Sequence, residues 1–480
     1  MIPSEPNTTN GNLCISKPLQ IPNPALVNAS QYANVTTAQA TKTANEPKLA
    51  TLSTDLKCEE EWGAGAPIHT GKDEDYEEYP EGGVRAYLCV FGSFCGCMLS
   101  LGLINSLAVF QSYITSHQLA GTPASSAGWI FGIYAFMSFF CGIQVGPIFD
   151  AKGPKWLVAI GSLLILLTYL LLGFCNAYWH FILAFSIVGG VGTSLVFTSS
   201  IAAVSHWFSV ERGRWTGLAC AGGGVSGIII PLALHALLPQ IGWAWSTRVL
   251  GLMNVLLAIC ANLFIRGRLP AKPTTRASTM PNLVMFKDKT MLLAAIAVFF
   301  VDWGLFIPLG YLTSYALSVG IDQSLSYQLV AILNAGSCLG RYFPGYMADF
   351  LGRFNAMILA ITVCLASTFG LWLPAGNNHI LIIAFAAIFG FGSGSGISLV
   401  PVCVGQLCQT EEYARYYATC CTVMSFATLT GFPVAGAVIG ACGGEYWGLI
   451  IFTGVSYTIG AAFFLAARIT KTGWVLYAKF

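Results

Sequence analysis

Apolar and polar positions alternate along the chain in long blocks. From Ala86 onward, runs of about twenty mainly apolar residues are separated by short polar connections. A helix rises about 1.5 Å per residue, so each run is long enough to cross a hydrocarbon core about 30 Å thick. The pattern predicts an all-α membrane protein with about twelve transmembrane helices, at residues 86–111, 128–149, 155–175, 179–205, 215–238, 246–265, 290–316, 326–348, 355–374, 379–405, 416–440 and 446–468.

Two short motifs occur twice at nearly the same spacing. Gly-x3-Asp-x2-Gly begins at Gly146 and again at Gly345, which is 199 residues later (345 − 146). Glu-x2-Arg begins at Glu211 and again at Glu412, which is 201 residues later (412 − 211). Parallel repeats of this kind are a design of membrane transporters. We therefore predict two pseudo-symmetric six-helix halves.

The blocks divide the chain into five segments. Residues 1–80 are rich in Asn, Thr, Ser and Pro, and their low hydrophobicity predicts a disordered cytoplasmic tail. Residues 81–265 hold the first six helices and residues 290–468 the second six. Residues 266–289 form a basic cytoplasmic linker, which we expect to meet anionic lipid head groups. Residues 469–480 are predicted to be a cytoplasmic C-terminal tail.

Composition and charge distribution support this interpretation. Of the 480 residues, 55% are hydrophobic and 9% are charged, which leaves too little polar surface for a soluble globule of this size. Lys and Arg fall in alternate connections, so the positive-inside rule predicts that both termini and both Gly-x3-Asp-x2-Gly turns are cytoplasmic. Fourteen of the 16 cysteines lie within or next to the apolar segments after residue 80, without metal-ligand spacing, so we expect core residues, no metal site and no cofactor.

These motifs resemble the major facilitator superfamily, in which Gly-x3-Asp-x2-Gly turns join the second helix to the third and the eighth to the ninth. Within it, Glu-Gly-Gly-Val-Arg-Ala-Tyr at residues 81–87 and the stretch at residues 206–222 are similar to the monocarboxylate-porter family. Asn-Ser-Leu-Ala-Val-Phe-Gln at residues 105–111 is similar to its fungal branch. The resemblance covers residues 81–480 and implies the twelve-helix major facilitator fold.

Two charged side chains lie well inside the predicted spans, where an isolated charge costs about 3 kcal/mol on insertion scales. Asp302 is predicted to lie about 18 Å from the cytoplasmic end of its helix and Arg341 about 11 Å, which would let them face each other. We interpret Arg341 as the fixed cation that receives a carboxylate or another anion through its forked guanidinium. A structural pair, or an arginine that reaches the inner membrane face, is the alternative.

The family comparison changes the expected chemistry of this site. In the animal porters, the eighth helix has an acidic residue one turn before the arginine and the first helix has a lysine, a set associated with proton-coupled lactate transport. Ser337 and Asn105 stand at these positions here, so we expect a larger or less acidic substrate. Asp302 and His235 are then the candidate proton carriers, with a packing role as the alternative for His235. The remaining candidate substrate-binding residues are Asn334, Gln111 and Gln144.

The repeated turns are expected, from the resemblance, to latch the halves together on the cytoplasmic side when the protein opens outward. The latch residues are Gly146, Asp150, Gly153 and Arg214 in the first half and Gly345, Asp349, Gly352 and Arg415 in the second. The repeat predicts that Asp150 pairs with Arg214 and Asp349 with Arg415. Such a latch stabilises one of two packings, whereas a solvated surface pair, the alternative, contributes about 0–1 kcal/mol.

We therefore predict a secondary active transporter that moves a small organic anion or amphipathic metabolite by alternating access, as an exporter or importer of a fungal metabolic pathway. It is expected to function as a monomer, with a small-molecule substrate, membrane lipid and protons as the candidate coupling ion, and without nucleic acid. We expect the plasma membrane, with the vacuolar or another organelle membrane as the alternative. A non-transporting membrane sensor of a metabolite is the alternative function. We do not expect an enzyme, because the sequence has no nucleophile elbow or paired catalytic carboxylates.

Overall fold

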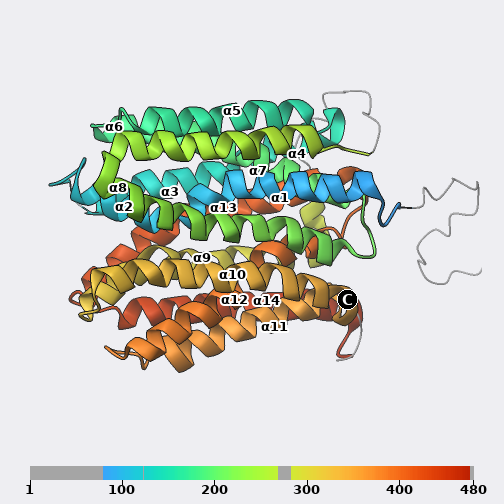
Figure 1. Ribbon diagram of the computed structural model, residues 1–480. Coiled ribbons are helices and arrows are strands. Elements are labelled where there is room, and N and C mark those ends of the chain that lie inside the picture. The colour runs from blue at the N-terminus through green and yellow to red at the C-terminus, as the bar shows by residue number, and fades with distance from the viewer. Residues whose placement is uncertain (1–78, 123, 269–282, 476–480) are drawn as a thin grey trace, which may run out of the picture. The chain divides into compact units, whose positions relative to one another are not determined.

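The computed structural model describes residues 79–122, 124–268 and 283–475. All regular secondary structure in these ranges is helical, and the helices belong to one packed unit (Figure 1). The predicted N-terminal tail and most of the predicted linker lie outside the described residues.

The first half contains eight α-helices and one π-helical segment. Ser106 separates α1 from α2, and Cys141 separates α3 from α4, so each of the first two predicted spans is a pair of helices in line. The elements are α1 (Val84–Asn105), α2 (Leu107–Ser116), α3 (Ala124–Phe140), α4 (Gly142–Lys152), α5 (Lys155–Leu172), α6 (Tyr178–Phe181), η1 (Ile182–Gly189), α7 (Gly190–Ser205) and α8 (Arg212–Phe264).

The second half begins after the linker with a short 3-10 helix. Most of its helices are single long elements, and Asp288 and Asp322 cap the starts of the first two by accepting a backbone N–H. The elements are η2 (Leu283–Lys287), α9 (Lys289–Ser318), α10 (Gln323–Leu351), α11 (Arg353–Ser367), η3 (Thr368–Trp372), α12 (His379–Val404), η4 (Thr410–Glu412), α13 (Tyr413–Ala441) and α14 (Trp447–Thr472).

Ten helices in the described part of the chain are long and apolar enough to cross a membrane. The fifth and sixth predicted spans form one of them, because α8 runs through 53 residues and reverses direction at Gly242, whose φ of 71° favours glycine. The helix α10 is not among the ten. It carries Arg341 and Asp349 together with two glutamines, an asparagine and several serines, which lower its mean hydropathy.

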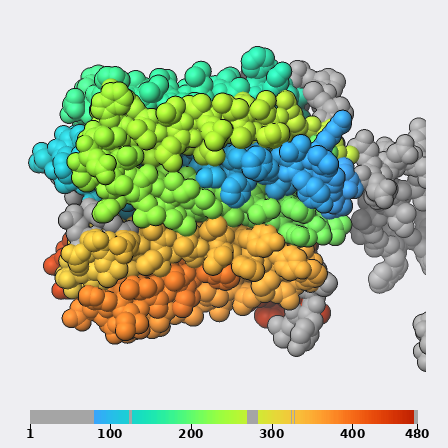
Figure 2. Space-filling model, in the orientation of Figure 1, coloured from blue at the N-terminus to red at the C-terminus, as the bar shows by residue number. Residues whose placement is uncertain are grey.

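The two halves meet along two seams, α8 against α10 and α3 and α4 against α13. Figure 2 shows the green surface of α8 lying directly on the yellow surface of α10. The helices approach each other so closely that only glycine fits at some positions. A Cβ on Gly224 would lie 2.8 Å from Cys338 Cα, and a Cβ on Gly146 would lie 2.6 Å from Ala418 Cβ. Close helix packing through glycines is typical of membrane interiors.

Candidate functional site: a central cavity and an interlocked end

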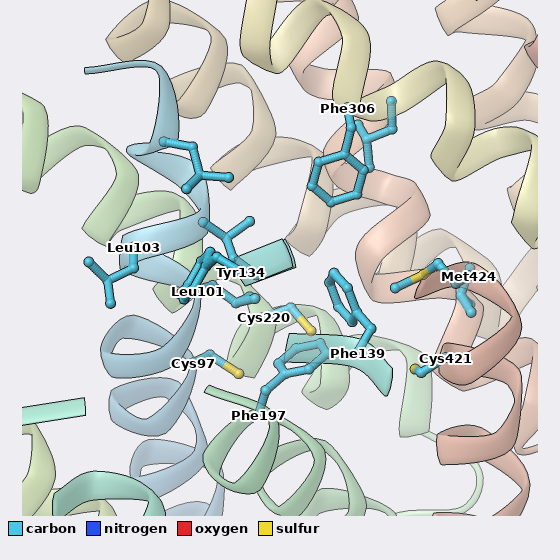
Figure 3. Close-up of a cluster of buried hydrophobic side chains, with 14 of the residues drawn as sticks. Cys97, Leu101, Leu103, Tyr134, Phe139, Phe197, Cys220, Phe306, Cys421 and Met424 are labelled. Carbon is cyan, nitrogen blue, oxygen red and sulfur yellow. The ribbon is translucent and has the colours of Figure 1, made fainter. Parts of the chain in front are cut away.

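A cavity of about 30 Å³ lies between the two halves. Its walls come from six helices, and Figure 3 shows Leu101, Phe139, Phe197, Phe306 and Met424 converging on this region from helices of both halves. The lining residues are Leu101, Ile104, Asn105, Phe139, Phe197, Asp302, Leu305, Phe306, Leu309, Gly396, Ile397, Val400, Tyr417 and Met424. The cavity is therefore mainly apolar, with a carboxyl group, an amide and a phenol among its lining side chains.

Two of the predicted binding residues, Asp302 and Asn105, line this cavity. Asp302 is 6% exposed, on α9. Asn105 is 4% exposed and donates from Nδ2 to the backbone oxygen of Gly223, 2.7 Å away. Asn334 in turn donates to the backbone oxygen of Asn105 at 3.2 Å and to that of Val330 at 2.9 Å. The two asparagines thus join α1, α8 and α10 across the seam, and the amide of Asn105 is already engaged.

Arg341 lies beside the cavity rather than in its wall. Its side chain is fully buried, and Nη1 donates to the backbone oxygen of Cys220 at 2.9 Å. Nε has no hydrogen-bond partner. A Cβ on Gly223 would collide with both Arg341 Nη1 and Leu101, and Leu101 is also a wall residue of the cavity. The guanidinium therefore lies next to a wall residue of the cavity without itself lining the cavity.

No ion pair joins Arg341 to Asp302 among the described residues. The sequence placed the two at similar depth on neighbouring helices, but helix rotation decides which surfaces they occupy. Arg341 lies against the glycine-rich face of α8, where Gly217 and Gly223 leave room for it. Asp302 lies on the cavity face of α9.

The other predicted site residues are dispersed. Ser337 is buried at the contact between α10 and α12, where its backbone oxygen would collide with a Cβ on Gly394. Gln111 in α2 and Gln144 in α4 do not line the central cavity, and Gln144 is exposed. His235 is exposed and lines a different pocket near the break in α8 at Gly242.

Both latch aspartates reach across the seam to the opposite half, which corrects the predicted pairs. Asp349 accepts the backbone N–H of Gly213 at 3.0 Å and that of Arg214 at 2.9 Å, in the first turn of α8. Asp150 accepts the backbone N–H of Arg415 at 2.9 Å, in the first turn of α13. The first four N–H groups of a helix have no partner within the helix, and the helix dipole favours an anion there.

The two arginines of the repeat instead form ion pairs within their own motifs. Arg214 lies 3.5 Å from Glu211, and Arg415 lies 3.5 Å from Glu412. The prediction that Asp150 pairs with Arg214, and Asp349 with Arg415, was therefore wrong. The repeat locates the residues but does not tell which half each carboxylate contacts.

Further contacts close the same end of the bundle, which we call the latch end. Arg212 donates to the backbone oxygen of Gly405 at 2.8 Å and to the hydroxyl of Thr410 at 3.2 Å. Arg353 donates to the backbone oxygen of Ser209 at 2.8 Å. Each of these bonds joins one half to the other. Sequence reasoning did not select Arg212 or Arg353, although both lie within one or two residues of the motifs.

Glu81 is another residue at the latch end that the sequence did not single out. Its carboxylate accepts the backbone N–H groups of Ser209 at 2.7 Å, Val210 at 2.8 Å and Glu211 at 3.3 Å. Glu81 itself has a φ of 44°, which few residues other than glycine adopt. It therefore shapes the loop that precedes α8, directly before the turn that Asp349 caps. The sequence feature that could have identified Glu81 is its position in the stretch at residues 81–87, which is similar to the monocarboxylate-porter family.

In the described part of the chain, no three His, Cys, Asp or Glu side chains come together in a way that could hold a metal ion. The features that do converge are an apolar cavity between two halves and a set of reciprocal helix caps that closes one end. These define a helical membrane protein whose halves are joined by polar contacts at one end.

Comparison with known proteins identifies the family. Residues 87–428 match the sequence profile of the Major Facilitator Superfamily. The chain is 36% identical over 400 residues to the MFS-type transporter opdF of Penicillium oxalicum, covering 83% of this chain and 94% of that one. It is 30% identical over 481 residues to the riboflavin transporter MCH5 of Saccharomyces cerevisiae, covering 94% and 92%. The chain belongs to the Major Facilitator Superfamily.

Two further comparisons agree with this assignment. The chain is 31% identical over 410 residues to the aspyridones efflux protein apdF of Emericella nidulans, covering 85% of this chain and 82% of that one. The crystal structure of the human organic anion transporter MFSD10 has the same fold, with a TM-score of 0.61 at 14% identity over 80% of this chain and 98% of that one. The protein is thus an integral membrane protein with fungal transporters among its relatives.

Proposed function

We propose that this protein is a secondary active transporter that moves a small organic anion or an amphipathic metabolite by alternating access. The observation that carries the proposal is the exchange of helix caps at the latch end. Asp150 and Asp349 each hold the first turn of a helix in the opposite half. Contacts of this kind can break and re-form as the halves rock, because the freed N–H groups and carboxylates become hydrated when that end opens.

The size of the central cavity supports a moving mechanism. Sites for small organic molecules have volumes of about 300–1,000 Å³. The cavity of about 30 Å³ is too small to hold such a compound. We therefore infer that the cavity widens as the halves separate at one end or the other, which is the motion expected of alternating access around a central site.

Arg341 is proposed to take part in anion binding once the cavity widens. Its Nε donor is buried without a partner, and leaving a donor of a charged group unsatisfied is costly. Widening of the cavity beside Leu101, which like Arg341 lies against Gly223, would bring a substrate carboxylate within reach of this donor. Asp302 and Asn105 are proposed to contact the remaining polar groups of the substrate, and Asp302 is the proposed proton carrier. His235 is remote from the central cavity and is retained only as a candidate.

The relatives named for riboflavin transport and for aspyridones efflux support an organic metabolite as the substrate class. We further propose that the chain crosses the membrane twelve times, with α8 and α10 supplying the spans that complete the count. The termini and the latch end are proposed to be cytoplasmic, and the plasma membrane is the proposed location. The direction of transport and the coupling to protons are proposals that the same experiment addresses.

The test is transport of labelled carboxylates, vitamins and pathway metabolites into and out of cells that express the native chain, Arg341→Ala or Arg248→Ala, at two external pH values. Arg248 is the matched control because it stacks on Phe174 and Trp245, remote from the cavity. Loss of flux in Arg341→Ala alone, at equal surface expression, would support the anion site. Equal flux in all three chains would refute it and favour a neutral substrate.

The alternative is a membrane sensor that binds a metabolite without transporting it. A chain lacking residues 1–75 distinguishes the two functions, because a transporter should keep its flux whereas a sensor should lose its signal. Native protein that reaches the membrane but moves no compound in either direction would favour the sensor.

A further inference from the structure

A second cavity, larger than the central one, lies at the end of the bundle opposite the latch. It has a volume of about 360 Å³ and is formed by α2, by the part of α8 just before its break at Gly242 and by the start of α10, which belong to both halves. The described lining residues with polar groups are Tyr113, Ser116, His117, His235, Ser324 and Gln328. This volume is within the range of sites for small organic ligands, about 300–1,000 Å³. We call it the outer pocket.

Three parallel rings lead into the outer pocket. The ring of Tyr113 is stacked on that of Trp243, with centroids 5.2 Å apart and planes 8° apart. His117 is stacked on Tyr113, with centroids 4.0 Å apart and planes 9° apart. No ring contact joins His117 to Trp243 in the described part of the chain, so the two lie on opposite faces of Tyr113. The rings therefore form a ladder in the order Trp243, Tyr113, His117.

The ladder is fixed at one end and open at the other. Trp243 is 9% exposed, donates from Nε1 to the backbone oxygen of Leu172 at 2.8 Å and meets Phe110 edge to face at 6.0 Å. His117 is exposed and is itself a wall residue of the outer pocket. An immobile base and an exposed terminal ring favour the addition of another flat ring, because offset-stacked rings gain about 0.5–1.5 kcal/mol beyond the area they bury.

The polar groups around the terminal ring suit an uncharged polar edge. His117 Nδ1 lies 2.8 Å from the hydroxyl of Ser116 and 3.1 Å from the backbone oxygen of Tyr113, so this nitrogen is engaged by its own segment and Nε2 is the ring nitrogen offered to a ligand. Gln328 has both donors and an acceptor, and Ser324 has a hydroxyl. Among the described residues that line the pocket, no side chain carries a carboxylate or an ammonium group.

We propose that the outer pocket binds a planar aromatic compound with an uncharged hydrogen-bonding edge, which stacks on His117 as the next step of the ladder. The edge of the compound contacts His235 and Gln328. The inference rests on the proposed function only in taking a transported compound to be the natural ligand. The binding site itself is a property of the pocket.

The test measures equilibrium binding of tritiated naphthalene-2-carboxamide to the full-length protein in phosphatidylcholine nanodiscs, with empty nanodiscs subtracted. Decahydronaphthalene-2-carboxamide, which has the same skeleton and edge but is not flat, is the competitor. We expect saturable binding that His117→Ala weakens by about 3- to 10-fold and that His117→Phe largely restores, because Phe keeps a flat ring. His180→Ala, which removes a half-buried imidazole elsewhere, is the control and should bind like the native chain.

Several outcomes would overturn the proposal. Equal competition by the saturated compound would show that the pocket is a general apolar site of the kind that a lipid chain fills. If His117→Ala binds the probe with unchanged affinity, stacking of the probe on His117 is refuted. Binding that is lost in Asp302→Asn but kept in His117→Ala would assign the compound to the central cavity. Because the measurement is binding, a protein that binds the probe but transports nothing would refute the proposed function and leave this site intact.

Discussion

Replacing Asp349 by Asn tests the exchange of caps at the latch end. The carboxylate accepts the N–H groups of Gly213 and Arg214, which have no acceptor within α8 because they belong to its first turn. Asparagine keeps the shape but has one accepting oxygen and no charge. One charge-assisted hydrogen bond is therefore lost, and such bonds contribute about 1.5–3 kcal/mol.

The assay is amide hydrogen exchange resolved at single residues. Since about 1.4 kcal/mol corresponds to a tenfold change in an equilibrium, the amide that loses its acceptor should exchange roughly 10- to 150-fold faster in Asp349→Asn. Asp288→Asn is the matched control, because Asp288 caps its own helix by accepting the N–H of Thr290 at 2.7 Å. Its effect should be confined to the first turn of α9.

The reasoning is refuted if the amides of Gly213 and Arg214 exchange within about twofold of the native rate in Asp349→Asn. It is also refuted if Asp288→Asn accelerates them to the same extent, because the effect would then reflect general loosening of the bundle. A faster exchange limited to these two amides would tie their protection to a side chain of the opposite half.

Three further predictions concern stability at or near the latch end and the second-half core. Glu81→Gln should accelerate exchange at the amides of residues 209–211 about tenfold while leaving surface expression unchanged, since the charge that these amides bind is removed. Gly340→Ala should lower the unfolding temperature, because the added Cβ would collide with the backbone of α12 and overpacking costs about 1–3 kcal/mol. Gly370→Ala is the control and should leave the unfolding temperature unchanged, because the space around Gly370 is open. Burial lowers the pKa of His206, just beyond the end of α7, to about 4. As the pH falls below about 6.5, the unfolded chain binds a proton at this residue before the folded chain does, which costs about 2 kcal/mol of stability by pH 5. Thermal melts should show this loss in the native chain but not in His206→Gln.

Helix positions could be predicted from the sequence because their cause is local. The apolar run 379–405 corresponds to α12 at His379–Val404, and the run 446–468 to α14 at Trp447–Thr472. Length and hydropathy decide such bounds residue by residue. The break at Gly242 was also signalled, since a connection between the fifth and sixth runs was expected there.

The arrangement of the site could not be predicted to the same degree, because it depends on contacts between distant segments. The repeat identified Asp150 and Asp349, but the choice between a cation of the same half and a helix start of the other half is made by the packing of the seams. Arg341 was identified by its charge in an apolar run. Its position outside the cavity wall follows from the way α10 packs on the glycines of α8, and the sequence of one chain does not reveal that packing.

The exchange of caps between the halves constrains how the sequence of this chain can diverge. A change at either aspartate alters the start of a helix in the other half, so the compensating change must arise there and not nearby. The two halves are expected to drift in sequence while keeping this complementarity. Chimaeras that join one half to the other half of a relative should therefore mature correctly only when both aspartates and both helix starts are compatible.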